Sequence, residues 1–212
     1  HDAQALASEL RAQGLEARVY GVPAYSTLGW TNWLGGDPLL STFIDYPEGE
    51  LARMVFHELA HQVVYVAGDT AFNESFATAV ERLGSAAWLA SQASSAAQAQ
   101  YTTLDARRQG FRALTAHTRQ VLSSIYSPDR QPQPGAQRMD EEKAAAYAEF
   151  RQNYAQLKAS WGGYDRYDAW VASANNAAFG ALAAYDDWVG AFEALFSACS
   201  ENWPNFYAAV IR

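Results

Sequence analysis

Apolar residues recur at helical spacing along most of the chain, and this pattern predicts a helix-rich protein. An early helix is expected over 2–11, with Gly14 as a candidate C-cap. From Pro47 onward, segments with the 3.6-residue period follow one another with short interruptions. The helices predicted there are 50–66, 71–92, 96–126, 139–160, 165–185, 188–200 and 203–211.

A shorter N-terminal part carries the pattern of β-structure. Residues 15–22 alternate between apolar and polar side chains and end at Pro23, which predicts a strand. Residues 25–30 are expected to be extended and 31–38 to form a loop, and 39–46 are a second candidate strand. A small N-terminal β portion followed by a helical body predicts an α+β fold that is dominated by helix.

One break interrupts the helical part. Residues 127–135 (SPDRQPQPG) contain three prolines and one glycine, and the helical pattern resumes at once, which favours an exposed loop over a domain linker. We therefore expect a single domain over 1–212. Its parts would be a small αβ portion (1–46), a first group of helices (47–126), a loop (127–137) and a helical C-terminal part (138–212). We also expect that an N-terminal portion precedes His1 in the whole protein.

Composition narrows the classes of function. Half of the 212 residues are apolar and 18% are charged, as in globular proteins. The net charge of −8 argues against a broad phosphate-binding surface, so nucleic acid is excluded as an expected partner. Cys199 is the one cysteine, so neither an intrachain disulfide nor a cysteine-cluster zinc site is possible. The chain shows no targeting signal and no apolar run of ~20 residues that would span a membrane.

The segment HELAHQ places two histidines four residues apart on a predicted helix. His57 and His61 therefore leave the same face one turn apart, which lets two ring nitrogens reach one metal ion. Glu58 lies between them, in the position of a general base that takes a proton from water. The alternative is a pair of ordinary surface histidines. The neighbouring apolar residues predict a buried helix and weigh against that alternative; they are Val55, Phe56, Leu59, Ala60, Val63 and Val64.

A catalytic zinc ion usually has three protein ligands and one open position. Glu74 is the candidate for the third ligand, because a tight turn at 67–69 would return the chain beside the histidines. Glu81 and Asp69 are the rivals. Glu81 is seven residues after Glu74 and so on the same helical face, where it could instead hold His57 or His61 by its free N–H. An ordinary salt bridge between Glu81 and Arg82 or another neighbour is an equally good interpretation.

These motifs resemble those of known peptidases. HELAHQ followed by NESFATAVE is similar to the gluzincin metallopeptidases, above all the large zinc aminopeptidases, whose third ligand lies in N-E-G-F-A. The resemblance implies a zincin-like core, with His57, His61 and Glu74 as Zn²⁺ ligands, Glu58 as the base and Glu81 in support. The spacing from His61 to Glu74 is shorter here, and the G-A-M-E-N strand of those enzymes has no counterpart.

A second resemblance covers more of the chain. GVPAYSTLGW, DPLLSTFID, the FHELAHQVVYVAGDTAFNESFATAVER block and the late ANNAAF and AFEALF segments resemble the bacterial "putative aminopeptidase" family. The match runs from about Leu15 to the C-terminus, and the TNWLGG loop is longer than is usual in the family. The resemblance implies a zinc peptidase that is exported, either periplasmic or lipid-anchored. Its substrate would be a peptide or protein, and the alternatives are a zinc endopeptidase and a non-catalytic, zinc-stabilised binding protein.

Several further residues are candidates for substrate contacts. Tyr185 and Tyr167 could stabilise the oxyanion, and Tyr25 and Trp30 could line a pocket beside an edge strand, although all four could equally pack in the core. His117 is expected at the surface. The carboxylates that could bind a substrate amine are Asp37, Asp45, Asp69 and Glu81. None belongs to a motif for that task, so we expect weak aminopeptidase activity from this chain.

Overall fold

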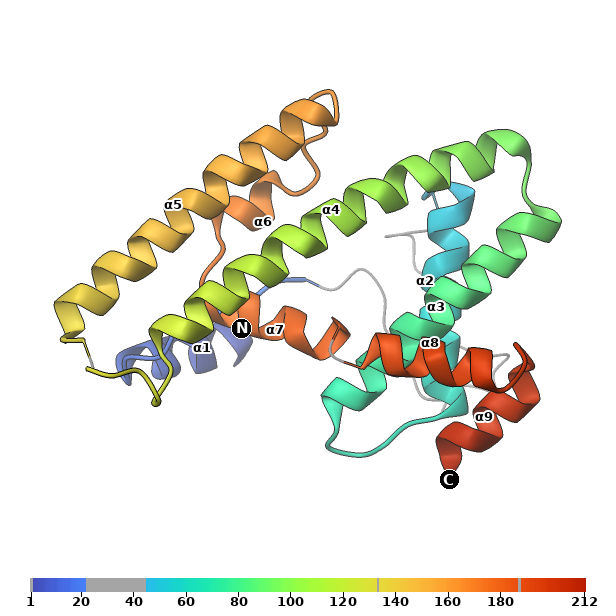
Figure 1. Ribbon diagram of the computed structural model, residues 1–212, viewed down its shortest axis with the longest axis horizontal. Helices are drawn as coiled ribbons and strands as arrows, with labels where there is room; N and C mark the ends of the chain where they lie inside the picture. The colour runs from blue at the N-terminus through green and yellow to red at the C-terminus, as the bar shows by residue number, and fades with distance from the viewer. Residues whose placement is uncertain (1, 22–44, 133, 187) are drawn as a thin grey trace. The chain divides into compact units, whose positions relative to one another are not determined.

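The computed structural model describes residues 2–21, 45–132, 134–186 and 188–212. Of these residues 75% are helical, and none is in a strand. The predicted α+β class is therefore wrong, and the described part of the protein is all-α. Figure 1 shows the helices in chain order, which are α1 (Asp2–Ala12), α2 (Glu48–Val63), α3 (Thr70–Gln92), α4 (Ser95–Ile125), α5 (Ala136–Ser160), α6 (Asp168–Ala172), α7 (Asn176–Asp186), α8 (Val189–Ala198) and α9 (Trp203–Ile211).

The predicted first strand is replaced by irregular chain whose polar groups bind to helices. Residues 15–21 have no regular structure. The Glu16 carboxylate pairs with the Lys143 ammonium and accepts a hydrogen bond from the Asn176 backbone N–H at 2.7 Å. The Ala17 carbonyl accepts a hydrogen bond from the Arg11 side chain at 2.9 Å. The Ala17 carbonyl, which a neighbouring strand could have paired with, thus binds a helix side chain instead. The alternation of apolar and polar residues was therefore a misleading signal for a strand.

The extended segment 25–30, the loop 31–38 and most of the strand 39–46 lie outside the described residues. Asp45 and Tyr46 are described, and they lie in a turn and a bend that lead into α2.

One predicted helix is two helices. The segment 165–185 is interrupted between α6 and α7, because the Asn175 side chain accepts a hydrogen bond from the Ala178 backbone N–H at 3.0 Å and so caps a new helix. The proline-rich segment 127–135 falls between α4, which ends at Ile125, and α5, which begins at Ala136.

Contacts between Cα atoms divide the chain into two compact units. Unit 1 comprises residues 1–19 and 103–180, and unit 2 comprises residues 20–102 and 181–212. Aromatic side chains dominate the core of unit 1, where Phe111 stacks on Tyr167 with 4.0 Å between ring centroids and Phe150 meets Trp170 edge to face. The site described below lies wholly in unit 2.

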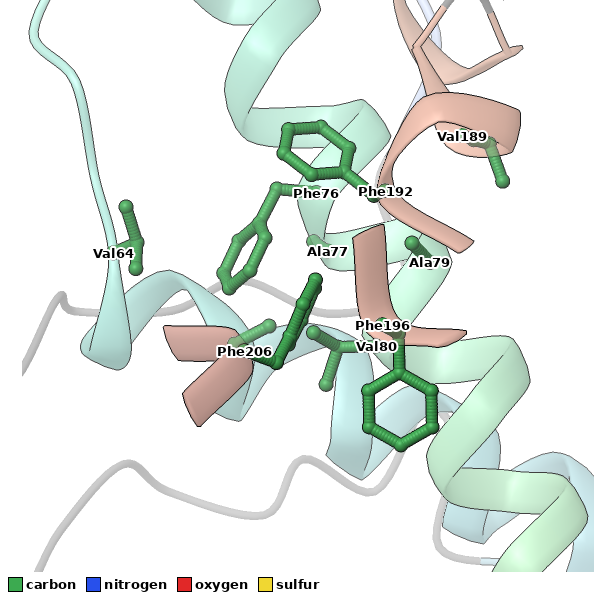
Figure 2. Close-up of a cluster of buried hydrophobic side chains, with 10 residues drawn as sticks. Val64, Phe76, Ala77, Ala79, Val80, Val189, Phe192, Phe196 and Phe206 are labelled. Carbon is green, nitrogen blue, oxygen red and sulfur yellow. The ribbon is translucent and has the colours of Figure 1, made fainter. Parts of the chain in front are cut away.

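Helix α3 forms the centre of unit 2. Phe76 is fully buried, and its ring lies 5.6 Å from that of Phe192 in α8 and 6.0 Å from that of Phe206 in α9. Figure 2 shows these rings together with the small side chains Ala77 and Ala79 of the same helix. Because helices α2, α8 and α9 all supply residues to this cluster, α3 is held in place from several directions.

Helix α2 packs closely against α3. A Cβ atom added at Gly84 would lie 3.0 Å from the Phe56 ring, so glycine permits this approach. The face of α2 that carries Leu59 and Val63 is not buried, since these side chains are 48% and 44% exposed. The expectation that α2 is buried nearly all round is therefore wrong.

Candidate metal centre

Helix α2 presents three polar side chains in a row toward α3. Arg53, His57 and His61 are spaced four residues apart, so they lie along one face of the helix, a turn from one another. The two imidazole rings are 5.1 Å apart between centroids and nearly perpendicular. The HELAHQ segment therefore has the helical placement that its spacing predicted.

Helix α3 runs antiparallel to α2 and brings Glu74 to both histidines. The Glu74 carboxylate lies 3.2 Å from His57 Nε2 through one oxygen and 3.8 Å from His61 Nε2 through the other. The three side chains each offer one ligand atom, and these atoms lie within 4.8 Å of one another. This is the group within the described residues that could hold a metal ion.

The donor types of this group are ones that a divalent ion such as zinc accepts. Two ligands at ~2.0–2.1 Å from a tetrahedral ion stand ~3.3 Å from each other. The 3.2 Å between Glu74 and His57 Nε2 is close to that value, whereas the 3.8 Å to His61 Nε2, measured from the other carboxylate oxygen, is longer. Two imidazole nitrogens and one carboxylate are also the ligands of catalytic zinc sites that keep an open position.

Glu81 lies on the other side of the His57 ring from Glu74. One of its carboxylate oxygens is 3.0 Å from His57 Nδ1, and the other accepts a hydrogen bond from Arg53 Nε. Its side chain is 5% exposed. Glu81 thus contacts His57 through Nδ1, the ring nitrogen that does not face Glu74. The alternative salt bridge between Glu81 and Arg82 is not formed, because Arg82 pairs with Glu193.

The charges around His57 change its protonation. Burial alone lowers the pKa of His57, but its hydrogen bonds to Glu74 and Glu81, and the charges of both, outweigh burial and raise this pKa from 6.5 to about 9. Burial alone raises the pKa of Glu81, whereas His57 and Arg53 together lower it to about 2. Without metal at neutral pH, His57 is therefore a cation that both carboxylates stabilise.

His61 has a different environment. Burial and the nearby charge of His57 both lower its pKa. Its Nδ1 atom is buried and has no hydrogen-bond partner among the described residues. Among the described residues, the two histidines therefore differ, because His57 is held through its second ring nitrogen and His61 is not.

The connection between the two helices sets the register of the site. Gly68 adopts a positive φ of 85°, which confirms the tight turn expected at 67–69. The Asn73 side chain donates to the Val66 carbonyl at 2.7 Å and accepts from the Val66 N–H at 2.8 Å, so it closes the connection directly before Glu74. Asp69 caps α3 by accepting a hydrogen bond from the Phe72 N–H at 2.9 Å and lies outside the metal-binding group.

Comparison with known families gives one match. The family model described as "Putative aminopeptidase" matches residues 1–212, which is the whole chain. The chain belongs to the "putative aminopeptidase" family. No curated protein and no solved structure matches it.

In this family member, the other predicted site residues belong to unit 1 or fall outside the described residues. Tyr167 belongs to unit 1, where it stacks on Phe111. His117 is exposed, as expected. Tyr25 and Trp30, like the side chain of Tyr185, fall outside the described residues. No helix of the described chain has the length and apolar character that crossing a membrane requires.

Sequence reasoning missed two residues that support the candidate metal centre. Arg53 stands four residues before His57, so the helical spacing that paired the histidines could also have placed Arg53 beside them. Asn73 directly precedes Glu74, but its contact is to a backbone seven residues earlier, and nothing in the local pattern indicates that partner.

Proposed function

We propose that this protein is a zinc-dependent peptidase of the gluzincin type, which hydrolyses peptide bonds with water, and that it acts as an aminopeptidase. The convergence of His57, His61 and Glu74 in unit 2 carries this proposal. The family name supports peptide substrates. The resemblance to exported bacterial members also supports a periplasmic or lipid-anchored location.

The proposed roles follow from the positions of the side chains. His57 and His61 would bind zinc through Nε2, because these atoms face Glu74, and Glu74 would bind through its carboxylate. Zinc, when bound, polarises the scissile carbonyl and makes water more acidic. Three protein ligands leave one position for substrate or water, whereas a structural zinc ion usually has four.

Glu58 is the proposed general base. It neighbours His57 on α2 and is not one of the three candidate ligands, which is the position of the residue that takes a proton from the attacking water in H-E-x-x-H sites. The same carboxyl group would then pass the proton to the leaving amine, which must be protonated to depart. Glu81 would hold His57 through Nδ1 so that Nε2 faces the ion.

Zinc content and peptide hydrolysis test the proposal together. Protein purified without chelator should contain one zinc ion per chain, and Glu74→Gln should lose it. Glu58→Gln should keep zinc and fold but lose at least ~10²-fold in turnover, the scale of a missing general base. Absence of zinc from wild-type protein, or equal turnover by wild type and Glu58→Gln, would contradict the proposal.

The choice of substrates separates an aminopeptidase from an endopeptidase. Peptides with a free amino terminus and N-acetylated peptides of the same sequence should be compared with the same enzyme preparation. An aminopeptidase cleaves the free-amine peptide faster, because it binds the charged α-amino group. Equal or faster cleavage of the blocked peptide would make the protein an endopeptidase.

A further inference from the structure

Arg53 contacts two carboxylates and no ligand of the proposed zinc site. Its Nε donates to one oxygen of Glu81, and its Nη1 lies 3.6 Å from the Glu50 carboxylate, one turn earlier on α2. The other oxygen of Glu81 is the one that lies 3.0 Å from His57 Nδ1. Arg53, Glu81 and His57 therefore form a continuous chain of hydrogen bonds that ends at a ligand.

We propose that Arg53 is a positioning residue for the metal site, which acts through Glu81 to hold the His57 ring with Nε2 toward the ion. This inference rests on the proposed zinc function. Arg53 occupies one Glu81 oxygen, so the other is left for His57 Nδ1–H. A carboxylate held at both oxygens has little freedom to rotate, and it transmits that restriction to the imidazole.

The described residues give the other histidine no equivalent support. His61 Nδ1 lacks a hydrogen-bond partner in the part of the chain that is described. Among the described residues, the Arg53–Glu81 pair is thus the polar contact to the second ring nitrogen of a candidate ligand. The pair is largely buried, with side-chain exposures of 24% and 5%.

The role of Arg53 can be distinguished from a simple effect of charge, because the two predict opposite signs. Arg53 is a cation near a site for a cation. By charge alone, its removal should tighten the binding of Zn²⁺. As a positioning residue, its removal should weaken binding, and loss of a residue that orients a ligand typically costs 10–100-fold in metal affinity.

The experiment is titration calorimetry of Zn²⁺ into the metal-free full chain, with circular dichroism as the check on folding. Arg53→Met should weaken zinc binding by about 10-fold or more. Arg53→Lys, which can still pair with Glu81, should recover most of the affinity. Glu50→Gln removes the other partner of Arg53 and is the matched control. The change should be about twofold or less, because this 3.6 Å contact is longer than a hydrogen bond and is not part of the connection from Arg53 to His57.

A double-mutant cycle tests whether the effect runs through Glu81. In a Glu81→Gln background, Arg53→Met should cause little further loss, because the connection is already broken. In zinc-loaded protein, the exchange-protected proton resonance of His57 Nδ1–H should be present in wild type and Arg53→Lys and absent in Arg53→Met. A purely structural role would not remove that resonance selectively.

Each outcome decides the inference. Equal or tighter zinc binding by Arg53→Met, or losses that add in the double variant, would overturn it. If Arg53→Met does not fold, Arg53→Gln serves the same test, since it also removes the charge and should again weaken binding rather than tighten it. Failure of wild-type protein to bind zinc would overturn the proposed function itself, which distinguishes the two failures.

Discussion

The unusual protonation of His57 makes the stability of the metal-free protein depend on pH. In the folded chain the pKa of His57 is about 9, against 6.5 in the unfolded chain, because Glu74 and Glu81 stabilise its charged form more than burial disfavours it. A raised folded-state pKa means that the stabilisation is fully present below pH 6.5. It is lost as the pH rises through about 9.

The size of this effect follows from the pKa difference. A pKa shift of one unit corresponds to about 1.36 kcal/mol. The rise in the pKa of His57 from 6.5 to about 9 therefore corresponds to about 3 kcal/mol of folding free energy. The His57 side chain is 14% exposed, so solvent screens this interaction little. Glu81 does not change protonation in this interval, because its pKa is lowered to about 2. The pKa of His61 is also lowered, so in the folded chain that residue is largely neutral across the interval.

The assay is urea unfolding in the presence of a chelator at several values of pH between 6.5 and 9.5. The free energy of unfolding should fall by about 3 kcal/mol over this range in wild type. His57→Gln is the control, since it removes the titrating group, and its free energy should fall by about 3 kcal/mol less. A wild-type free energy that stays constant or rises, or a slope that His57→Gln shares, would refute the reasoning.

Two further predictions concern α3. Asn73→Asp keeps the shape of the side chain but loses the donor to the Val66 carbonyl. Because a supporting contact is lost, this variant should bind zinc about 10-fold more weakly by calorimetry. Tighter binding caused by the added negative charge would contradict this prediction. Phe76→Ala empties the centre of unit 2 and should cost about 3–5 kcal/mol in urea unfolding. Leu59→Ala, at a side chain that is 48% exposed, should cost far less, and equal losses would refute the importance of the core.

The sequence alone was sufficient for features that depend on neighbours along one helix. The spacing of His57, Glu58 and His61 predicted their placement on α2, and the start of α3 was predicted to within one residue, at Ala71 against the observed Thr70. Gly68 marked the turn between the two helices. These signals are local, because the helical period and the turn preference of glycine act over a few residues.

Features that depend on partners distant in the chain were decided by tertiary structure. The alternating pattern at 15–22 favoured a strand, but the described residues 15–21 are irregular, and helix side chains such as Lys143 bind them instead. Sequence left Glu81 with two equal interpretations, and the antiparallel packing of α2 on α3 placed it between His57 and Arg53. Which carboxylate meets which imidazole depends on the register of two packed helices. That register is set by side-chain contacts such as Phe56 against Gly84, which no local period reveals.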